Sequence, residues 1–142
     1  MSVCGAFMCR LNVGGEQQKT CGSFDAKFYS QNVNGLNDEF KRRKVLNNFK
    51  DKADIIFVQE SHTTKKSENE YEAMWAGKIH FSHGTSASRG CAILFKNTLD
   101  HSVVDKKADP NGRYLLAKCI VFNFQRKLVI TLPYMLNVPS TR

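Results

Sequence analysis

The feature that most constrains the fold is a strand-like segment at residues 53–58, apolar except for Asp54, followed at once by Gln59-Glu60-Ser61-His62. Alternating polar and apolar residues would predict a strand with one wet face. The continuous run Ile55-Ile56-Phe57-Val58 instead predicts a strand covered on both faces. Such a strand needs a layer of structure on each side. The polar motif then falls at its carboxyl end, where open α/β sheets form their binding crevices.

The segment before this run supplies candidates for one layer. A strand is expected at residues 27–31, ended by Asn34-Gly35, and a helix at residues 38–50 with its cap at Asn37 or Asp38. Helical i,i+4 spacing is expected to turn two apolar pairs toward the core, namely Leu36/Phe40 and Val45/Phe49. Most of the basic residues between them are expected to face outward, namely Lys41, Arg42, Arg43 and Lys44.

The rest of the chain is rich in predicted strands. A helical turn is expected at residues 70–76, strands at 79–83, 91–95 and 101–105, and a hairpin formed by 113–124 and 127–132. Asp109-Pro110-Asn111-Gly112 has the residue types of a turn. One or two helices followed by many strands favour an α+β fold or a layered sandwich over a doubly wound sheet.

Length and charge limit the class of protein. A chain of 142 residues forms one domain at most, and we expect residues 25–142 to belong to it, after a poorly ordered leader at residues 1–24. The net charge of +8 favours a polyanionic partner, although charge alone does not separate nucleic acid, an anionic membrane and a basic surface that binds neither. Five cysteines without a CxxC pair, and no apolar signal segment, predict an intracellular protein.

Three polar residues near the predicted strand ends each allow two interpretations. Glu60 is a candidate ligand for a hard cation such as Mg²⁺, and the alternative is a carboxylate paired with a Lys or Arg. Asn32 and Asn34 can orient a carboxylate, a water or a phosphate oxygen, or they can simply form an Asn-Gly turn with Gly35. His62 has no partner visible in the sequence and is expected at the surface.

The loop at residues 82–90 offers hydroxyl groups, glycines and Arg89. Such a loop can hold a phosphate through backbone N–H groups and a guanidinium. It lacks the order of residues of a P-loop, so nucleoside triphosphate binding is not indicated. The other histidines, His80, His83 and His101, have no ligand spacing that predicts a zinc site.

The order of these motifs is more specific than any one of them. Asn-x-Asn-Gly-Leu, a basic helix, Gln-Glu-Ser-His, Ser-His-Gly with Ser-Arg-Gly, and Asp-Pro-Asn-Gly-Arg-Tyr follow one another between residues 27 and 137. This series resembles the endonuclease domain of LINE-type (non-LTR) retrotransposons, which is similar to exonuclease III and the apurinic endonucleases in the endonuclease/exonuclease/phosphatase superfamily. The resemblance implies a four-layer α/β sandwich, of which this chain would be the N-terminal part.

The resemblance also implies a site and a reaction. Glu60 and Asn32 would belong to a Mg²⁺ site, with Mn²⁺ as the alternative metal, and Asn34 and Tyr134 would be catalytic. Tyr134 matches a family segment in which Leu132 and Leu136 here replace an Asn and a Pro. Two arginines would bind the substrate, namely Arg89 and Arg113. The partner would be DNA, nicked in the nucleus to prime reverse transcription.

The chain departs from the family pattern after residue 137. A Gly-Asp-Phe-Asn-type motif, a later Asp and a terminal Ser-Asp-His are expected in the family and do not occur before Arg142. The expectation is therefore a truncated copy whose activity is open, because residues that act as a unit fail as a unit. Its stability is expected to be marginal, because the missing strands leave apolar edge and face exposed. Two rivals are a non-catalytic, basic nucleic-acid-binding remnant and a phosphatase of the same superfamily.

Overall fold

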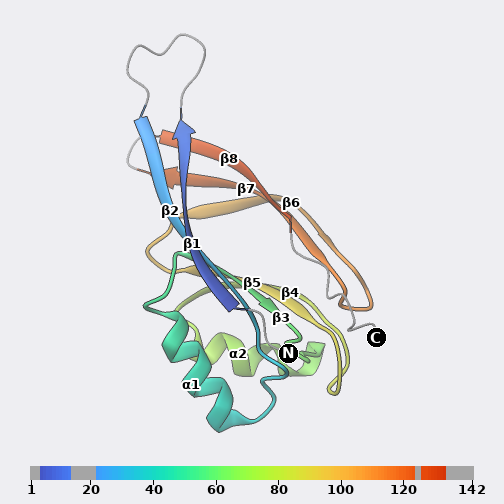
Figure 1. Cartoon of the computed structure of the whole chain (residues 1–142). Helices are drawn as coiled ribbons and strands as arrows, with labels where there is room; N and C mark the ends of the chain where they lie inside the picture. The colour runs from blue at the N-terminus through green and yellow to red at the C-terminus, as the bar shows by residue number, and fades with distance from the viewer. Residues whose placement is uncertain (1–3, 14–21, 124–125, 134–142) are drawn as a thin grey trace.

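Two β-sheets and two short helices form the molecule in a computed structural model, which describes residues 4–13, 22–123 and 126–133, with side chains for 27–121 (Figure 1). The larger sheet has the strand order β1-β2-β3-β5-β4, and the smaller has the order β6-β7-β8. The strands are β1 Cys4–Val13, β2 Gly22–Asn32, β3 Ile55–Gln59, β4 Gly77–Ser82, β5 Cys91–Lys96, β6 His101–Ala108, β7 Leu115–Asn123 and β8 Arg126–Pro133. The helices are α1 Glu39–Phe49, the 3-10 turn η1 Lys65–Ser67 and α2 Glu68–Met74.

The central strand β3 is buried along its whole length, as the apolar run predicts. Ile56 and Val58 pack in one core cluster with residues of α1 and α2. Ile55 and Phe57 pack in a second cluster with β7, on the opposite face of the sheet. The helices thus cover one face of the larger sheet and the smaller sheet covers the other (Figure 1). The expected α+β architecture is confirmed, with three layers of the expected sandwich present.

The N-terminal segment differs from the expected leader. Residues 4–13 form β1, which pairs antiparallel with β2 from Cys4 opposite Gln31 to Val13 opposite Gly22. The expected strand at residues 27–31 is therefore only the last part of a longer strand. A backbone ladder needs no hydrophobic period of its own when a neighbouring strand offers a free edge, so the weak pattern of this segment concealed a strand.

Helix α1 forms where it was expected, with two corrections in the faces of its side chains. Asp38 caps it by accepting a hydrogen bond from the Lys41 backbone N–H at 2.8 Å. Phe49 is fully buried, but Phe40 is 78% exposed and does not face the core. Arg42, expected to face outward, is only 4% exposed. Its Nη1 donates to the Leu36 carbonyl and the Asn37 carbonyl, at 3.1 Å each. Its Nη2 lies 3.8 Å from the Glu70 carboxylate, and its Nε has no hydrogen-bond partner among the described residues.

The remaining elements complete the layers. The predicted hairpin is confirmed as β7 and β8, which pair antiparallel. Trp75, after α2, donates from its indole N–H to the Phe95 carbonyl at 3.0 Å and ties the helical layer to β5. Neither helix in the described part of the chain has the length and apolarity needed to cross a membrane.

Candidate active site at the ends of the parallel strands

The parallel pairing of β2 with β3 brings the two polar motifs side by side. Asn32 lies opposite Gln59 in the register, and the chain continues to pair beyond the strands. The Gly35 N–H donates to the Glu60 carbonyl at 2.6 Å, and the Leu36 N–H donates to the Ser61 carbonyl at 3.2 Å. The Asn-x-Asn-Gly loop therefore runs along the Gln-Glu-Ser-His loop, as the carboxyl ends of neighbouring parallel strands should.

Two more of the predicted motifs join the same group of loops. The Ser61 N–H donates to the Gly90 carbonyl at 3.0 Å, and the His62 N–H donates to the Arg89 carbonyl at 2.8 Å. The Gly90 N–H in turn donates to the Gly112 carbonyl at 3.0 Å. Residues 59–63 are thus held on one side by the loop after β2 and on the other by the loop before β5, with the Asp-Pro-Asn-Gly turn behind.

Unusual backbone angles gather in these loops. Among the described residues, four that are not glycine have positive φ, namely Asn34 at 51°, Glu60 at 54°, His62 at 58° and Arg89 at 64°. The left-handed region is unfavourable for residues with a Cβ, by about 1–2 kcal/mol each. Residues held in such conformations cluster at functional sites, where the surrounding structure enforces them. All four lie in the loops that meet here.

Close packing against glycines explains the spacing of the motifs. A Cβ on Gly35 would lie 2.5 Å from Nδ1 of His62, and one on Gly90 would lie 2.6 Å from Oγ of Ser61. A Cβ on Gly112 would lie 2.6 Å from the His83 carbonyl oxygen. Each motif thus contributes a glycine that lets another segment of the site approach.

Glu60 occupies the position expected of a site residue, with a different partner from either alternative. Its Oε1 lies 3.1 Å from Nε2 of His62, and the two side chains are 29% and 14% exposed. His62 is therefore not a surface histidine, which corrects the expectation. Both residues have positive φ, so the contact is made within a loop rather than along an extended strand. Glu60 Oε2 accepts no hydrogen bond from the described residues.

The two asparagines act first as turn residues. Oδ1 of Asn32 accepts from the Asn34 backbone N–H at 3.0 Å, which is an Asx turn. The Asn34 side chain is exposed. Lys41, which was expected to face outward from the helix, donates from Nζ to the Val33 carbonyl at 2.8 Å and to the Asn34 carbonyl at 3.3 Å. This ammonium holds the turn and adds positive charge beside it.

The two predicted substrate-binding residues lie in different surroundings. Arg89 is exposed and its backbone belongs to the site. Arg113 is turned toward Asp109, to which its Nε donates at 2.8 Å. The hydrogen bond from Arg113 holds the pKa of Asp109 below its ordinary value. This pair closes the Asp-Pro-Asn-Gly turn, while the Arg113 side chain remains 56% exposed, so its substrate-binding role stays a prediction. Tyr134 lies outside the described residues.

A network of side-chain hydrogen bonds that was not expected from the sequence links the loop after β3 to α2. The buried hydroxyls of Ser61 and Thr63 lie 3.1 Å apart, and Thr63 Oγ1 lies 3.2 Å from Nδ1 of His83. Nε2 of His83 pairs with the Glu68 carboxylate. Partial burial opposes ionisation of Glu68, but the hydrogen bonds from His83 and Lys65 outweigh it, so the pKa of Glu68 lies below its ordinary value. In the sequence, only the hydroxyl residues after the buried strand, Ser61 and Thr63, indicate such a network.

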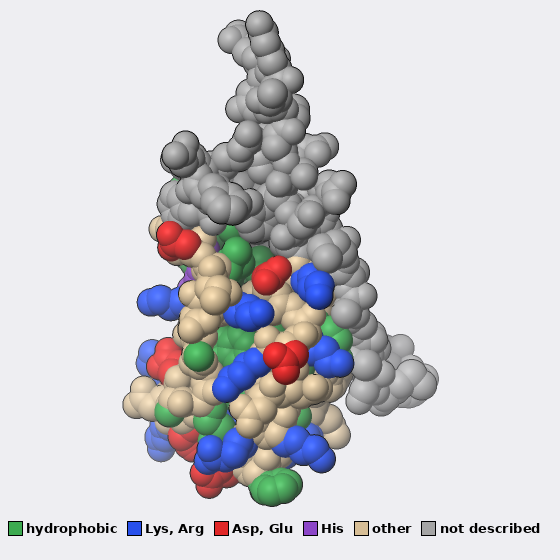
Figure 2. Space-filling model, turned by 90° about the vertical axis from the view of Figure 1, so that its left-hand side faces the viewer, with side chains coloured by type: hydrophobic (Ala, Val, Ile, Leu, Met, Phe, Trp, Pro, Cys, Tyr) green, Lys and Arg blue, Asp and Glu red, His purple; other side chains and the backbone are tan. Residues whose placement is uncertain are grey.

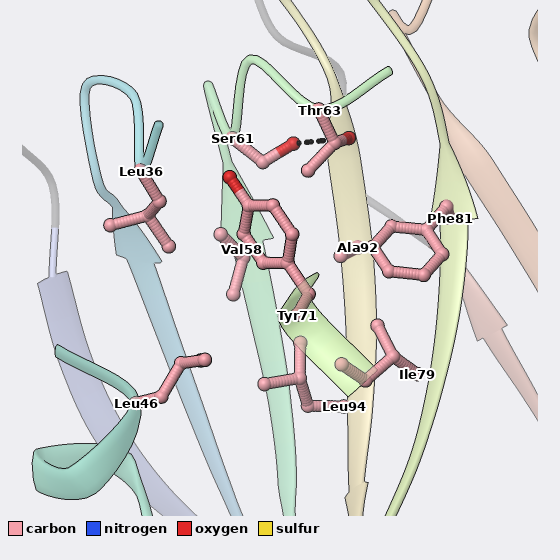
Figure 3. Close-up of a pocket in the computed structure, with 10 residues that line it drawn as sticks. All are labelled: Leu36, Leu46, Val58, Ser61, Thr63, Tyr71, Ile79, Phe81, Ala92 and Leu94. Atoms are coloured by element: carbon pink, nitrogen blue, oxygen red, sulfur yellow. Dashed lines mark hydrogen bonds between the residues drawn. The ribbon is translucent and has the colours of Figure 1, made fainter. Parts of the chain in front are cut away.

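A small cavity lies beneath residues 61 and 63, and it is not the substrate site. Its volume is about 10 Å³, and mainly apolar side chains line it (Figure 3). Figure 3 shows the Tyr71 ring rising from α2 with its hydroxyl toward Ser61. That hydroxyl has no hydrogen-bond partner among the described residues. The cavity has room for about one water molecule and none for a nucleotide.

The donor atoms at the strand ends match a hard cation in kind. Glu60 contributes a carboxylate and Asn32 an amide oxygen, and oxygen atoms are the ligands that Mg²⁺ prefers. No group of three or more His, Cys, Asp or Glu side chains able to hold a metal ion occurs within the described ranges. Mg²⁺ usually keeps several waters and is held by one or two carboxylates together with substrate phosphate, so one carboxylate is a sufficient beginning.

Comparison with known proteins agrees with this geometry. Residues 29–134 match the model of the Endonuclease/Exonuclease/phosphatase family. The chain is also 31% identical over 85 residues to the Transposon TX1 uncharacterized 149 kDa protein of Xenopus laevis. That alignment covers 59% of this chain, and the chain spans only 6% of the length of the transposon protein. The matched residues include the loops that hold Glu60, Arg89 and Gly112, and the chain belongs to the Endonuclease/Exonuclease/phosphatase family.

Proposed function

We propose that this chain acts in metal-dependent hydrolysis of phosphodiesters, as a DNA-nicking endonuclease of the retrotransposon type. The observation that carries the proposal is the position of Glu60 at the end of a buried strand. In the loops around it, four residues that are not glycine have positive φ, namely Asn34, Glu60, His62 and Arg89. Family membership supports a nuclease- or phosphatase-type function. The likeness to a transposon protein favours DNA as the substrate, with retrotransposition as the setting.

Each residue of the site receives a role in this proposal. Glu60 and Asn32 hold the cation through oxygen atoms, and Asn34 offers an exposed amide to a phosphate oxygen. When bound, Mg²⁺ or Mn²⁺ supplies Lewis-acid polarisation of the scissile phosphate. Arg89 neutralises a phosphate of the DNA backbone from the rim of the site. Tyr134 is assigned by its motif alone.

His62 adds a role that the sequence did not suggest. Its Nε2 contacts Glu60 Oε1, and a histidine in this position orients the carboxylate while leaving Oε2 to face a ligand. The His62 ring packs against Gly35, where a Cβ would lie 2.5 Å from Nδ1, and the His62 backbone N–H donates to the Arg89 carbonyl, so both the ring and its backbone have contacts that position them. The orientation of Glu60 is therefore set before a metal or a substrate arrives.

A plasmid-nicking assay tests the proposal. With Mg²⁺ present, the chain is expected to convert supercoiled DNA to the nicked circle, and Glu60→Gln is expected to reduce the rate by about 100-fold or more. Glu72→Gln, an exposed carboxylate on α2, is the matched control and should leave the rate unchanged. Equal rates for the wild type and Glu60→Gln would sink the proposal.

Non-catalytic DNA binding is the second candidate, and the net charge of +8 favours it. On the side of the molecule that lies at the left of Figure 1, Lys and Arg side chains alternate with Asp and Glu over the described surface (Figure 2). That mixture gives no continuous basic stripe on this side. Salt-dependent DNA binding without nicking would support this candidate, and hydrolysis of a phosphate monoester instead of DNA would support the phosphatase branch.

A further inference from the structure

Two histidines meet at the rim between the two sheets, away from the candidate active site. His80 lies on β4, at the edge of the larger sheet, and His101 is the first residue of β6 in the smaller sheet. Their Nε2 atoms are 3.4 Å apart. Both rings pack on Phe95, with the His101 ring stacked at 3.7 Å between centroids and the His80 ring edge-on at 5.5 Å. Because both rings pack on Phe95, their Nε2 atoms lie next to each other.

The separation also fits a shared metal. Without a metal the two nitrogen atoms are within hydrogen-bond range of each other, at the long end of the range for N–H donors. Two imidazole nitrogens bound to Zn²⁺ at about 2.0–2.1 Å with tetrahedral geometry lie about 3.3–3.4 Å apart. The observed distance thus corresponds to one edge of a zinc coordination tetrahedron.

One of the two histidines borders an open groove. His101 lines a cavity of about 390 Å³ together with Lys78, Asn97, Thr98 and Asp100, which gives an ion access to its ring. Within the described ranges no third His, Cys, Asp or Glu joins the two histidines, so water would complete the coordination.

We propose that His80 and His101 form a two-histidine site for a divalent transition metal of the zinc class, bridging β4 and β6. Imidazole selects Zn²⁺, Ni²⁺ or Cu²⁺ over Mg²⁺, so this site is chemically distinct from the oxygen ligands around Glu60. Lys78 and Lys106 repel a cation, which makes the binding weak. The bound ion links the two sheets and therefore binds the folded chain only.

Zinc-dependent thermal unfolding of the untagged chain tests this site. Excess Zn²⁺ is expected to raise Tm by about 5 °C or more in the wild type, and to do so at the same concentration in Glu60→Gln. His80→Gln and His101→Gln should each abolish the rise. Lys106→Gln, which removes a repelling charge, should tighten binding by about threefold. A rise in Tm that persists in both histidine variants would overturn the proposal.

Cobalt spectroscopy of the wild type provides a test that needs no substitution. Co²⁺ bound at this site should give tetrahedral visible absorption that Zn²⁺ displaces, without the charge-transfer band of a thiolate ligand. The missing band separates the histidine pair from cysteine sites such as Cys91 or Cys119. Wild-type protein that shows no Co²⁺ absorption at about 1 mM metal has no such site.

Discussion

Gly90 illustrates how single residues define the candidate site. Its φ is +97°, and a Cβ would lie 2.6 Å from Oγ of Ser61. Gly90→Ala is therefore expected to lower the free energy of unfolding by more than about 1 kcal/mol, since both the backbone angle and the contact reject a side chain. Chemical denaturation measures the change. Ser86→Ala, at an exposed position of the same loop, should change stability by less than about 0.5 kcal/mol. Equal effects of the two substitutions would contradict this account.

The sequence located Glu60 but not its partner. A carboxylate directly after a buried strand can be read from the apolar run, because the run fixes where the strand ends. The contact with His62 is made in a loop where both residues have positive φ, and nothing in the residue types signals this backbone. The burial of Arg42 was missed for a related reason, since its Nη1 donates to carbonyl groups of a loop whose course the sequence does not reveal.

At the scale of elements, helix α1 is attached to the sheet mainly by its C-terminal half. Phe49 is fully buried against the sheet, whereas Phe40 is 78% exposed near the first turn. Phe49→Ala should cost about 3–5 kcal/mol of unfolding free energy, and Phe40→Ala should stay within about 0.5 kcal/mol. Thermal or urea denaturation of the two variants provides the comparison. A large loss for Phe40→Ala would mean that this side chain is covered in solution.

Element prediction succeeded where residue patterns were strong. The buried strand β3, helix α1 with its cap at Asp38 and the β7–β8 hairpin all follow from local patterns. Strand β1 did not, because a strand at the edge of a sheet is stabilised by backbone pairing with β2 and needs little pattern of its own. The meeting of the loops after β2 and β3 was predictable once their parallel pairing was assumed.

At the scale of the whole molecule, acid should loosen the contact between the two sheets. The pKa of His80 is about 4 in the folded chain and 6.5 ordinarily, so the unfolded chain binds more protons between these values. The stabilisation is fully present above pH 6.5 and is lost as the pH falls toward 4. After allowance for solvent screening, the loss is about 2 kcal/mol. Glu68, whose pKa is lowered, adds a further loss only below its ordinary value of 4.5.

Urea denaturation from pH 7.5 to 4.5 measures this dependence. His80→Gln should reduce the slope between pH 6.5 and 4.5, because one group that gains a proton on unfolding has been removed; His101, whose pKa burial also lowers, keeps part of the slope. His62→Gln should leave the slope attributed to His80 in place. An unchanged slope in His80→Gln would assign the acid sensitivity to other groups.

The positive φ angles at Asn34, Glu60, His62 and Arg89 have a consequence for how such a sequence is retained over time. Selection for folding alone would favour glycine at positions of this kind, at least where the side chain adds little packing, because glycine adopts these angles without the steric penalty. Four larger side chains persist there at the expense of stability. Glycine replacements at the exposed residues Asn34 and Arg89 should therefore raise the free energy of unfolding and lower the DNA-nicking rate. The size of the two changes measures how strongly function has determined the residues at this end of the molecule.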